Sequence, residues 1–239
     1  MMDRFRTYDA IFMGAFGDPR VPDMRHAAEI LLGRASSSIS TPTSGRSGAS
    51  PTGSVRSRDA TRKDVDFVVF RENTEGLYVG MGGNFKKGTP DEIAIQEDVN
   101  TRKGVERIIR EAFRLRRSGR AASRVTMSDK SNVLRFGHDL WQRVFQEVAR
   151  EYPAIEANHL YVDALTMQMV KDPSQFEVIV TCNMFGDIVT DLGAQLQGGL
   201  GLAASGQHPS GPDLDVRAGA RIGAEVRREG HRPTRSGRS

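Results

Sequence analysis

The sequence predicts an α/β fold, and this prediction depends on three strand-like runs that alternate with helical segments. The runs DFVVF, RVTMSD and EVIVT lie between residues 64 and 206, and a helical segment follows each of them. Such alternation is typical of α/β domains. The chain has 239 residues, of which 38% are hydrophobic, and is therefore long enough to bury a core.

The first half of the chain divides into two zones of different composition. Residues 1–33 contain an apolar strand candidate at 8–17, a turn at Asp18-Pro19 and a helix candidate at 24–33, and we interpret them as a fragment of a first α/β domain. Residues 34–63 are rich in Ser, Thr, Gly and Arg and poor in large apolar residues. We expect this second zone to be of low complexity and disordered.

The second half holds the predicted α/β core and a basic tail. Residues 64–206 contain the three strand candidates and helices expected at 102–115, 134–151 and 186–197. We expect this core to carry the substrate and metal site and the part that forms a dimer. Residues 207–239 return to Gly, Arg, Pro and Ser, and we expect them to be a disordered tail.

The net charge of +4 comes from two segments rather than from the core. Residues 34–63 hold six basic side chains against one acidic, and residues 207–239 hold seven against four, so the remainder is acidic. A nucleic-acid-binding module that uses these segments is one alternative, but they lack interleaved aromatic residues, so we expect no nucleic-acid partner. The chain has no run of eighteen apolar residues and no apolar stretch of a secretory signal. We therefore expect a cytoplasmic protein without a membrane partner.

Three aspartates are the most informative candidates for a functional site. Asp187 and Asp191 are four residues apart, so they lie on one face of the helix that follows the strand candidate 176–181. That position is the carboxyl edge of the sheet, where open α/β sheets bind ligands. With Asp163 as a third carboxylate, the set has the oxygen ligands that Mg²⁺ or Mn²⁺ prefers.

Two further motifs follow predicted strands and contain residue types suited to acid-base chemistry. In RENTEGLYVG, Arg71 can hold a carboxylate through two hydrogen bonds, and Tyr78 can donate a proton if a neighbouring cation lowers the pKa of its hydroxyl. In DKSNVL, Lys130 can act as a base if desolvation or nearby cations favour its neutral form, and Asn132 lies two residues further on.

The remaining side chains of chemical interest predict structural roles. A single cysteine, Cys182, excludes an internal disulfide and a multi-cysteine zinc site, and we expect it to be a buried neighbour of the candidate site. Trp141 fits the buried face of a helix. The histidines show no ligand spacing, and we interpret all five as structural: His26, His138, His159, His208 and His231.

Four motifs together resemble the isocitrate and isopropylmalate dehydrogenase family of metal-dependent β-decarboxylating dehydrogenases: RENTEGLYVG, DKSNVL, YVDALTMQMVKDPSQFEVIVTCNMFGDIVTDL and GGLGLAAS. The resemblance covers residues 8–33 and 64–206. The stretch GMGGNFKKGTPDEIAIQEDVNTRKGVERIIR most resembles the tartrate dehydrogenase/decarboxylase and D-malate dehydrogenase branch. The resemblance implies a three-layer α/β/α fold with a mixed sheet, incomplete in this chain, and not a GxGxxG Rossmann fold.

The resemblance also implies an activity and a set of cofactors. It implies NAD-dependent, divalent-metal-dependent oxidation and oxidative decarboxylation of a 2-hydroxy dicarboxylic acid such as tartrate or D-malate. The alternative within the family is 3-isopropylmalate or isocitrate dehydrogenase. The metal would acidify the substrate hydroxyl and stabilise the enolate that forms when carbon dioxide leaves.

By resemblance, each candidate residue takes a role. Arg71 binds a substrate carboxylate, Tyr78 protonates the enol carbon, Lys130 takes part in removing the hydroxyl proton, and Asn132 lies by the substrate and the nicotinamide. Asp163, Asp187 and Asp191 match the metal ligands. The family builds each site from two subunits of a homodimer, with the counterparts of Lys130 and Asp163 supplied by the partner, so we expect a monomer to be inactive.

Two segments depart from the family pattern. Residues 34–63 replace a strand and an arginine motif that binds substrate, and residues 207–239 replace a loop that holds the adenosine half of the cofactor. GC-rich codons for these segments, translated in another frame, can give both family motifs. We therefore expect a frameshifted and truncated gene product that binds NAD weakly or not at all; the DNA sequence of the gene tests this.

Overall fold

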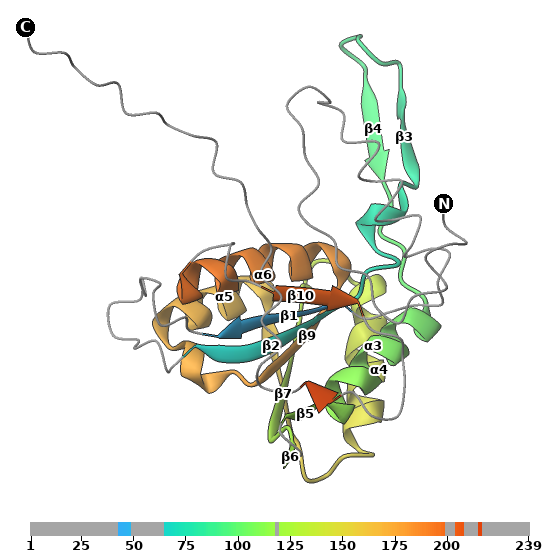
Figure 1. Ribbon diagram of the computed structural model, residues 1–239. Helices are drawn as coiled ribbons and strands as arrows, with labels where there is room; N and C mark the ends of the chain where they lie inside the picture. Colours follow the sequence, from blue (N-terminus) through green and yellow to red (C-terminus); the bar gives the residue numbers. More distant parts are fainter. Residues whose placement is uncertain (1–42, 49–64, 118–119, 199–203, 208–214, 217–239) are drawn as a thin grey trace, which may run out of the picture.

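The computed structural model describes residues 43–48, 65–117, 120–198, 204–207 and 215–216. Helices lie on both sides of a central sheet, and a hairpin projects away from the body (Figure 1). The strands are β1 (Thr43–Gly48), β2 (Asp66–Arg71), β3 (Gly82–Phe85), β4 (Ile93–Gln96), β5 (Arg116–Arg117), β6 (Arg120–Ala121), β7 (Arg124–Asp129), β8 (Glu156–Tyr161), β9 (Val178–Thr181), β10 (Ala204–Gln207) and β11 (Asp215–Val216). The helices are η1 (Leu77–Val79), α3 (Arg102–Arg114), α4 (Gly137–Ala149), α5 (Val162–Lys171), η2 (Pro173–Gln175) and α6 (Asn183–Gln197).

The central sheet is mixed, as the resemblance implies. Its six strands have the order β10-β1-β2-β9-β7-β8. β2, β9, β7 and β8 run parallel, whereas β1 is antiparallel to both β2 and β10. Because parallel strands end at the same edge, the residues that follow β2, β7, β8 and β9 gather at one edge of the sheet.

Two cores flank this sheet and produce the three layers. Along β2, Val68 and Phe70 pack into the core beneath α3 and α4, while Phe67 and Val69 pack into the core beneath α5 and α6. A strand buried on both faces needs a continuous apolar run rather than an alternating one, which explains the sequence DFVVF. Trp141 of α4 is 1% exposed in the first core, which confirms its predicted buried position.

The predicted elements of the core agree with the structure to within a few residues. The helices expected at 102–115, 134–151 and 186–197 are observed as α3, α4 and α6, and α6 begins three residues earlier than expected. β8, α5 and the β3–β4 hairpin were not predicted. None of the helices in the described part of the chain is both long and apolar enough to cross a membrane.

Two strands lie in segments that the sequence predicts to be disordered: β1 in residues 34–63, and the two-residue β11, which pairs with β5, in residues 207–239. Residues 34–63 are poor in large apolar side chains, yet β1 pairs with β2 over six residues. Its backbone supplies hydrogen bonds to an edge of β2 that neighbours no other strand, and this pairing does not need apolar side chains. The other residues of this segment, and the strand and helix expected within 8–33, lie outside the described residues.

Candidate functional site

The predicted site residues gather where the parallel strands end. Arg71 is the last residue of β2, and Lys130 follows β7 directly. Asp163 lies in the first turn of α5, which follows β8, and Asp187 lies near the start of α6, which follows β9. The strand-end rule thus indicated Arg71, Lys130 and Asp187, whereas Asp163 follows β8, a strand that was not predicted.

Arg71, Tyr78 and Asp187 form the first of two clusters at this edge. The Nη1 atom of Arg71 lies 2.6 Å from Oδ1 of Asp187, and the hydroxyl of Tyr78 donates to Oδ2 of the same carboxylate at 3.3 Å. The guanidinium also lies 5.5 Å from the centre of the Tyr78 ring, a cation–π distance. One carboxylate therefore binds both groups that the sequence assigned to substrate chemistry.

The electrostatics of Tyr78 differ from the prediction. Burial, followed by the negative charge of Asp187, raises the pKa of the Tyr78 hydroxyl above its ordinary value. The charge of Arg71 acts in the opposite direction but is a smaller effect. The prediction of a pKa lowered by a neighbouring cation is therefore wrong for this arrangement, because burial and the charge of Asp187 outweigh the effect of Arg71 on the pKa of Tyr78.

Lys130 and Asp163 form the second cluster. Lys130 Nζ lies 2.8 Å from Oδ1 of Asp163, and this hydrogen bond lowers the pKa of the Asp163 carboxyl. The ammonium also lies 5.8 Å from the centre of the Tyr161 ring. The backbone N–H of Lys130 donates to Nδ1 of the buried His138 at 2.8 Å, so that histidine positions the start of the DKSNVL turn. Asn132 is exposed on the same turn.

The three predicted metal ligands are divided between these clusters. Asp187 and Asp191 lie one turn apart on α6, and the pKa of Asp191 is raised by burial and then by the charge of Asp187. Two carboxylates that repel each other in this way suit a divalent cation. Asp163, however, pairs with Lys130, and no three acidic, His or Cys side chains gather as a metal site within the described part of one chain.

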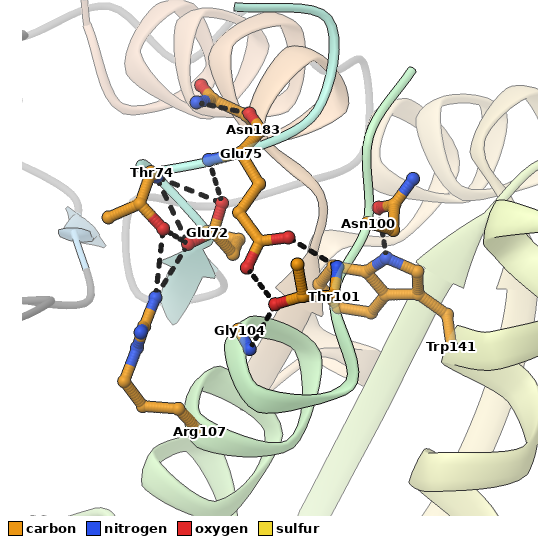
Figure 2. A network of polar contacts seen from close by, with 9 residues as sticks. All are labelled: Glu72, Thr74, Glu75, Asn100, Thr101, Gly104, Arg107, Trp141 and Asn183. Carbon is orange, nitrogen blue, oxygen red and sulfur yellow. Dashed lines mark hydrogen bonds and ion pairs between the residues drawn. The ribbon is translucent and has the colours of Figure 1, made fainter. Parts of the chain in front are cut away.

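Sequence reasoning missed the residues that support the RENTEGLYVG loop (Figure 2). The carboxylate of Glu72 accepts hydrogen bonds from the backbone N–H groups of Thr74 and Glu75 and pairs with Arg107 of α3 at 2.8 Å. The carboxylate of Glu75 in turn accepts from the backbone N–H and the hydroxyl of Thr101, the residue that caps α3. The loop between Arg71 and Tyr78 is therefore tied to a core helix at two points.

Comparisons with known proteins give the family. The sequence model described as "Isocitrate/isopropylmalate dehydrogenase" matches residues 1–214. The chain belongs to the isocitrate/isopropylmalate dehydrogenase family. It is 43% identical over 224 residues to the 3-isopropylmalate dehydrogenase of Thermobifida fusca and 46% identical over 212 residues to that of Frankia casuarinae. The isocitrate dehydrogenase of Methylococcus capsulatus superposes with a TM-score of 0.61 at 34% identity, over 85% of this chain and 57% of that one.

Within the isocitrate/isopropylmalate dehydrogenase family, these relatives favour a different branch from the one that the sequence suggested. The matches cover 87% of this chain for the T. fusca enzyme and 88% for the F. casuarinae enzyme, and both are named 3-isopropylmalate dehydrogenase. The stated alternative is thus better supported than the tartrate or D-malate assignment. The chain spans 59% and 61% of the lengths of these two relatives.

Histidines in the described part have the structural roles that were predicted. His138 is buried and its pKa is lowered, first by burial, so it is a neutral hydrogen-bond acceptor for Lys130. His159 lies 2.8 Å from the buried Asp129. The other three histidines lie outside the described residues.

The burial of Cys182 predicts that its thiol reacts only in the unfolded protein. The thiol is buried beside the start of α6, and burial raises its pKa from 9.0 to about 12. We expect no alkylation by iodoacetamide at pH 8 in the folded protein and complete alkylation in urea, as measured by mass spectrometry. Above pH 9 the unfolded chain loses this proton while the folded chain keeps it, so stability should fall as the pH rises toward 12. Rapid alkylation of the folded protein would contradict this.

Proposed function

We propose that this site serves NAD-dependent, divalent-metal-dependent oxidation and decarboxylation of a 2-hydroxy dicarboxylate, and that the substrate is 3-isopropylmalate. The observation that carries the proposal is the meeting of Arg71, Tyr78 and Asp187 at the carboxyl edge of the sheet. The arrangement joins a carboxylate-binding guanidinium, a proton donor and a metal-binding carboxylate. The choice of substrate is supported by the names of the relatives.

In this proposal each side chain has a separate task. Arg71 holds a substrate carboxylate, Asp187 and Asp191 supply oxygen ligands to Mg²⁺ or Mn²⁺, and Tyr78 donates a proton to the carbon that loses carbon dioxide. A bound divalent cation supplies Lewis acidity at the substrate hydroxyl. Asn132, exposed after β7, would lie beside the substrate and the nicotinamide when they are bound.

A second copy of the chain completes the site. In its neutral amine form Lys130 would accept the hydroxyl proton, and Asp163 would supply the third metal ligand, but both lie in a cluster separate from Arg71 and Asp187. A homodimer allows the Lys130–Asp163 cluster of one copy to meet the Asp187 cluster of the other. This arrangement explains why the aspartates do not converge within the described part of one chain.

The β3–β4 hairpin is the surface that we assign to this homodimer. Phe85 pairs with Ile93 and Gly83 with Ile95, so the three apolar side chains share one face, and they are 62%, 51% and 54% exposed. The hairpin projects from the body (Figure 1). An isolated two-stranded hairpin is marginally stable in water, and an apolar face of this kind is stabilised by packing on a partner. The β3–β4 hairpin of a second copy of the chain supplies such a face.

Replacing Ile95 by lysine is expected to convert the dimer into a monomer, because it places a charge in the apolar face of the hairpin. Sedimentation velocity measures the change, and far-UV circular dichroism should remain that of the wild type. Ala94→Lys is the matched control: it adds the same charge at a neighbouring exposed residue that points to the other face. A wild-type chain that is monomeric at all concentrations would contradict the assignment.

Binding of 3-isopropylmalate in the presence of Mg²⁺, measured by isothermal titration calorimetry, tests the proposed function. We expect binding to require the cation and to be stronger than that of D-malate or tartrate, and we expect Asp187→Asn to abolish the dependence on Mg²⁺. NADH formation at 340 nm is a second readout. Stronger binding of tartrate would restore the tartrate assignment, and binding without a cation would contradict the proposal.

A further inference from the structure

The guanidinium of Arg71 is held by the first turn of α6. Its Nε and Nη2 atoms donate to the same acceptor, Oδ1 of Asn183, at 3.1 and 2.8 Å, while Nη1 reaches Asp187. All three nitrogens therefore contact one short stretch of one helix. Arg71 comes from β2 and Asn183 follows β9, and these two strands are parallel neighbours.

The amide of Asn183 has a fixed orientation. The side chain is buried at 3% exposure, and its Nδ2 atom donates to the backbone oxygen of Glu75 at 3.2 Å (Figure 2). An inverted amide would direct its N–H groups at the guanidinium and its oxygen at a carbonyl, so both contacts would become repulsive. The bond to Glu75 therefore ensures that the acceptor faces Arg71.

Gly186 provides the space that this contact requires. A Cβ atom at Gly186 would lie 2.4 Å from Cγ and 2.7 Å from Cβ of Arg71, which is closer than side chains tolerate. The aliphatic part of Arg71 thus rests directly on the helix backbone. Asn183, Gly186 and Asp187 have the i, i+3, i+4 spacing that places residues on one helix face.

We propose that Asn183 and Gly186 are positioning residues that clamp Arg71. Asn183 occupies Nε and Nη2, so the guanidinium keeps its orientation when the Asp187 carboxylate is engaged elsewhere. Nη1 then faces the site and is available to a carboxylate of a dicarboxylate ligand. The clamp itself is inferred only from the contacts of Arg71 with Asn183 and Gly186. Its effect on ligand binding rests on the proposed function of Arg71.

The test of the clamp is the ¹⁵Nε–¹Hε resonance of Arg71 in the full chain, assigned by its disappearance in Arg71→Lys. In the wild type we expect a resonance shifted from that of exposed arginines and protected from exchange with water. Asn183→Ala should move it to the exposed position and accelerate its exchange at least 10-fold, while Asn183→Asp, which keeps an acceptor oxygen, should retain the protection. An unchanged resonance in Asn183→Ala overturns the clamp.

A second variant guards against loss of folding in Asn183→Ala. Gly186→Ala removes the space for the side chain of Arg71 while raising the helix propensity of α6, so the resonance should move in a protein whose folding is checked by circular dichroism. Asn84→Ala, in the exposed hairpin, is the matched control and should leave the resonance unchanged. A folded Gly186→Ala protein with the wild-type resonance contradicts the proposal.

The same Arg71 resonance distinguishes a failure of the clamp from a failure of the proposed function. With 3-isopropylmalate and Mg²⁺, we expect the wild-type resonance to shift and Asn183→Ala to bind this ligand at least about 10-fold more weakly, as expected for an ionic hydrogen bond that is misaligned. A wild-type resonance that does not respond to the ligand refutes the proposed role of Arg71. The clamp is then still tested by the Arg71 resonance of the Asn183→Ala protein without ligand.

Discussion

Replacing Glu72 by alanine is expected to lower the free energy of unfolding by about 3–5 kcal/mol, because it breaks a buried ion pair and leaves the partner charge uncompensated. Glu72 is 3% exposed, and Arg107, its partner at 2.8 Å, has a side chain that is 16% exposed. Without Glu72, Arg107 keeps a hydrogen bond to the Thr74 hydroxyl and an attraction to the Glu75 carboxylate, while its Nε atom is buried without a hydrogen-bond partner. The backbone N–H groups of Thr74 and Glu75 would lose their acceptor as well.

Urea unfolding followed by circular dichroism measures this effect. Glu156→Ala is the matched control, since Glu156 pairs with Arg124 at 2.9 Å on the surface and should cost less than about 1 kcal/mol. The double variant Glu72→Ala/Arg107→Met should recover part of the loss, because it removes the isolated charge. Equal losses in Glu72→Ala and Glu156→Ala would refute the assignment of Glu72 as a buried structural charge.

The fold was predictable wherever burial makes the local pattern strong. DFVVF and EVIVT were identified because β2 and β9 are buried on both faces and need apolar runs. β8 has the sequence EANHLY and lies at the edge of the sheet, where much of it is solvent-accessible and the pattern is weak. The β3–β4 hairpin is exposed along its whole length, so its apolar face packs on no core among the residues that the structure describes.

The site was predictable in its residues but not in its contacts. Strand ends indicated Arg71, Lys130 and Asp187, since polar residues after buried strands are conspicuous. The Arg71–Asp187 pair depends on β2 and β9 being parallel neighbours, and no local pattern encodes that order. Asn183 lies before the helix expected at 186–197, although it is the first residue of α6. Its spacing from Gly186 and Asp187 was the signal that could have indicated its role.

Replacing either Asp163 or Asp187 by asparagine is expected to reduce Mn²⁺ binding to a similar extent, at least about 10-fold, although the two residues occupy different clusters in one chain. The expectation follows from the proposed homodimer, in which each metal site combines Asp187 of one copy with Asp163 of the other. Electron paramagnetic resonance of free Mn²⁺ measures the binding. Asp139→Asn, at an exposed residue of α4, is the control and should have no effect.

Mixing the two variants gives the decisive result. After the chains exchange, half of the dimers contain one chain of each kind, and each mixed dimer keeps one site with both aspartates intact, so about one quarter of the wild-type sites should return. A site within one chain predicts no recovery, because each chain in the mixture lacks one ligand. Normal Mn²⁺ binding by Asp163→Asn alone would also refute the shared site. The separation of Asp163 from Asp187 in the structure would then reflect a metal site built from α6 and its neighbours, with Lys130 and Asp163 serving as a surface ion pair.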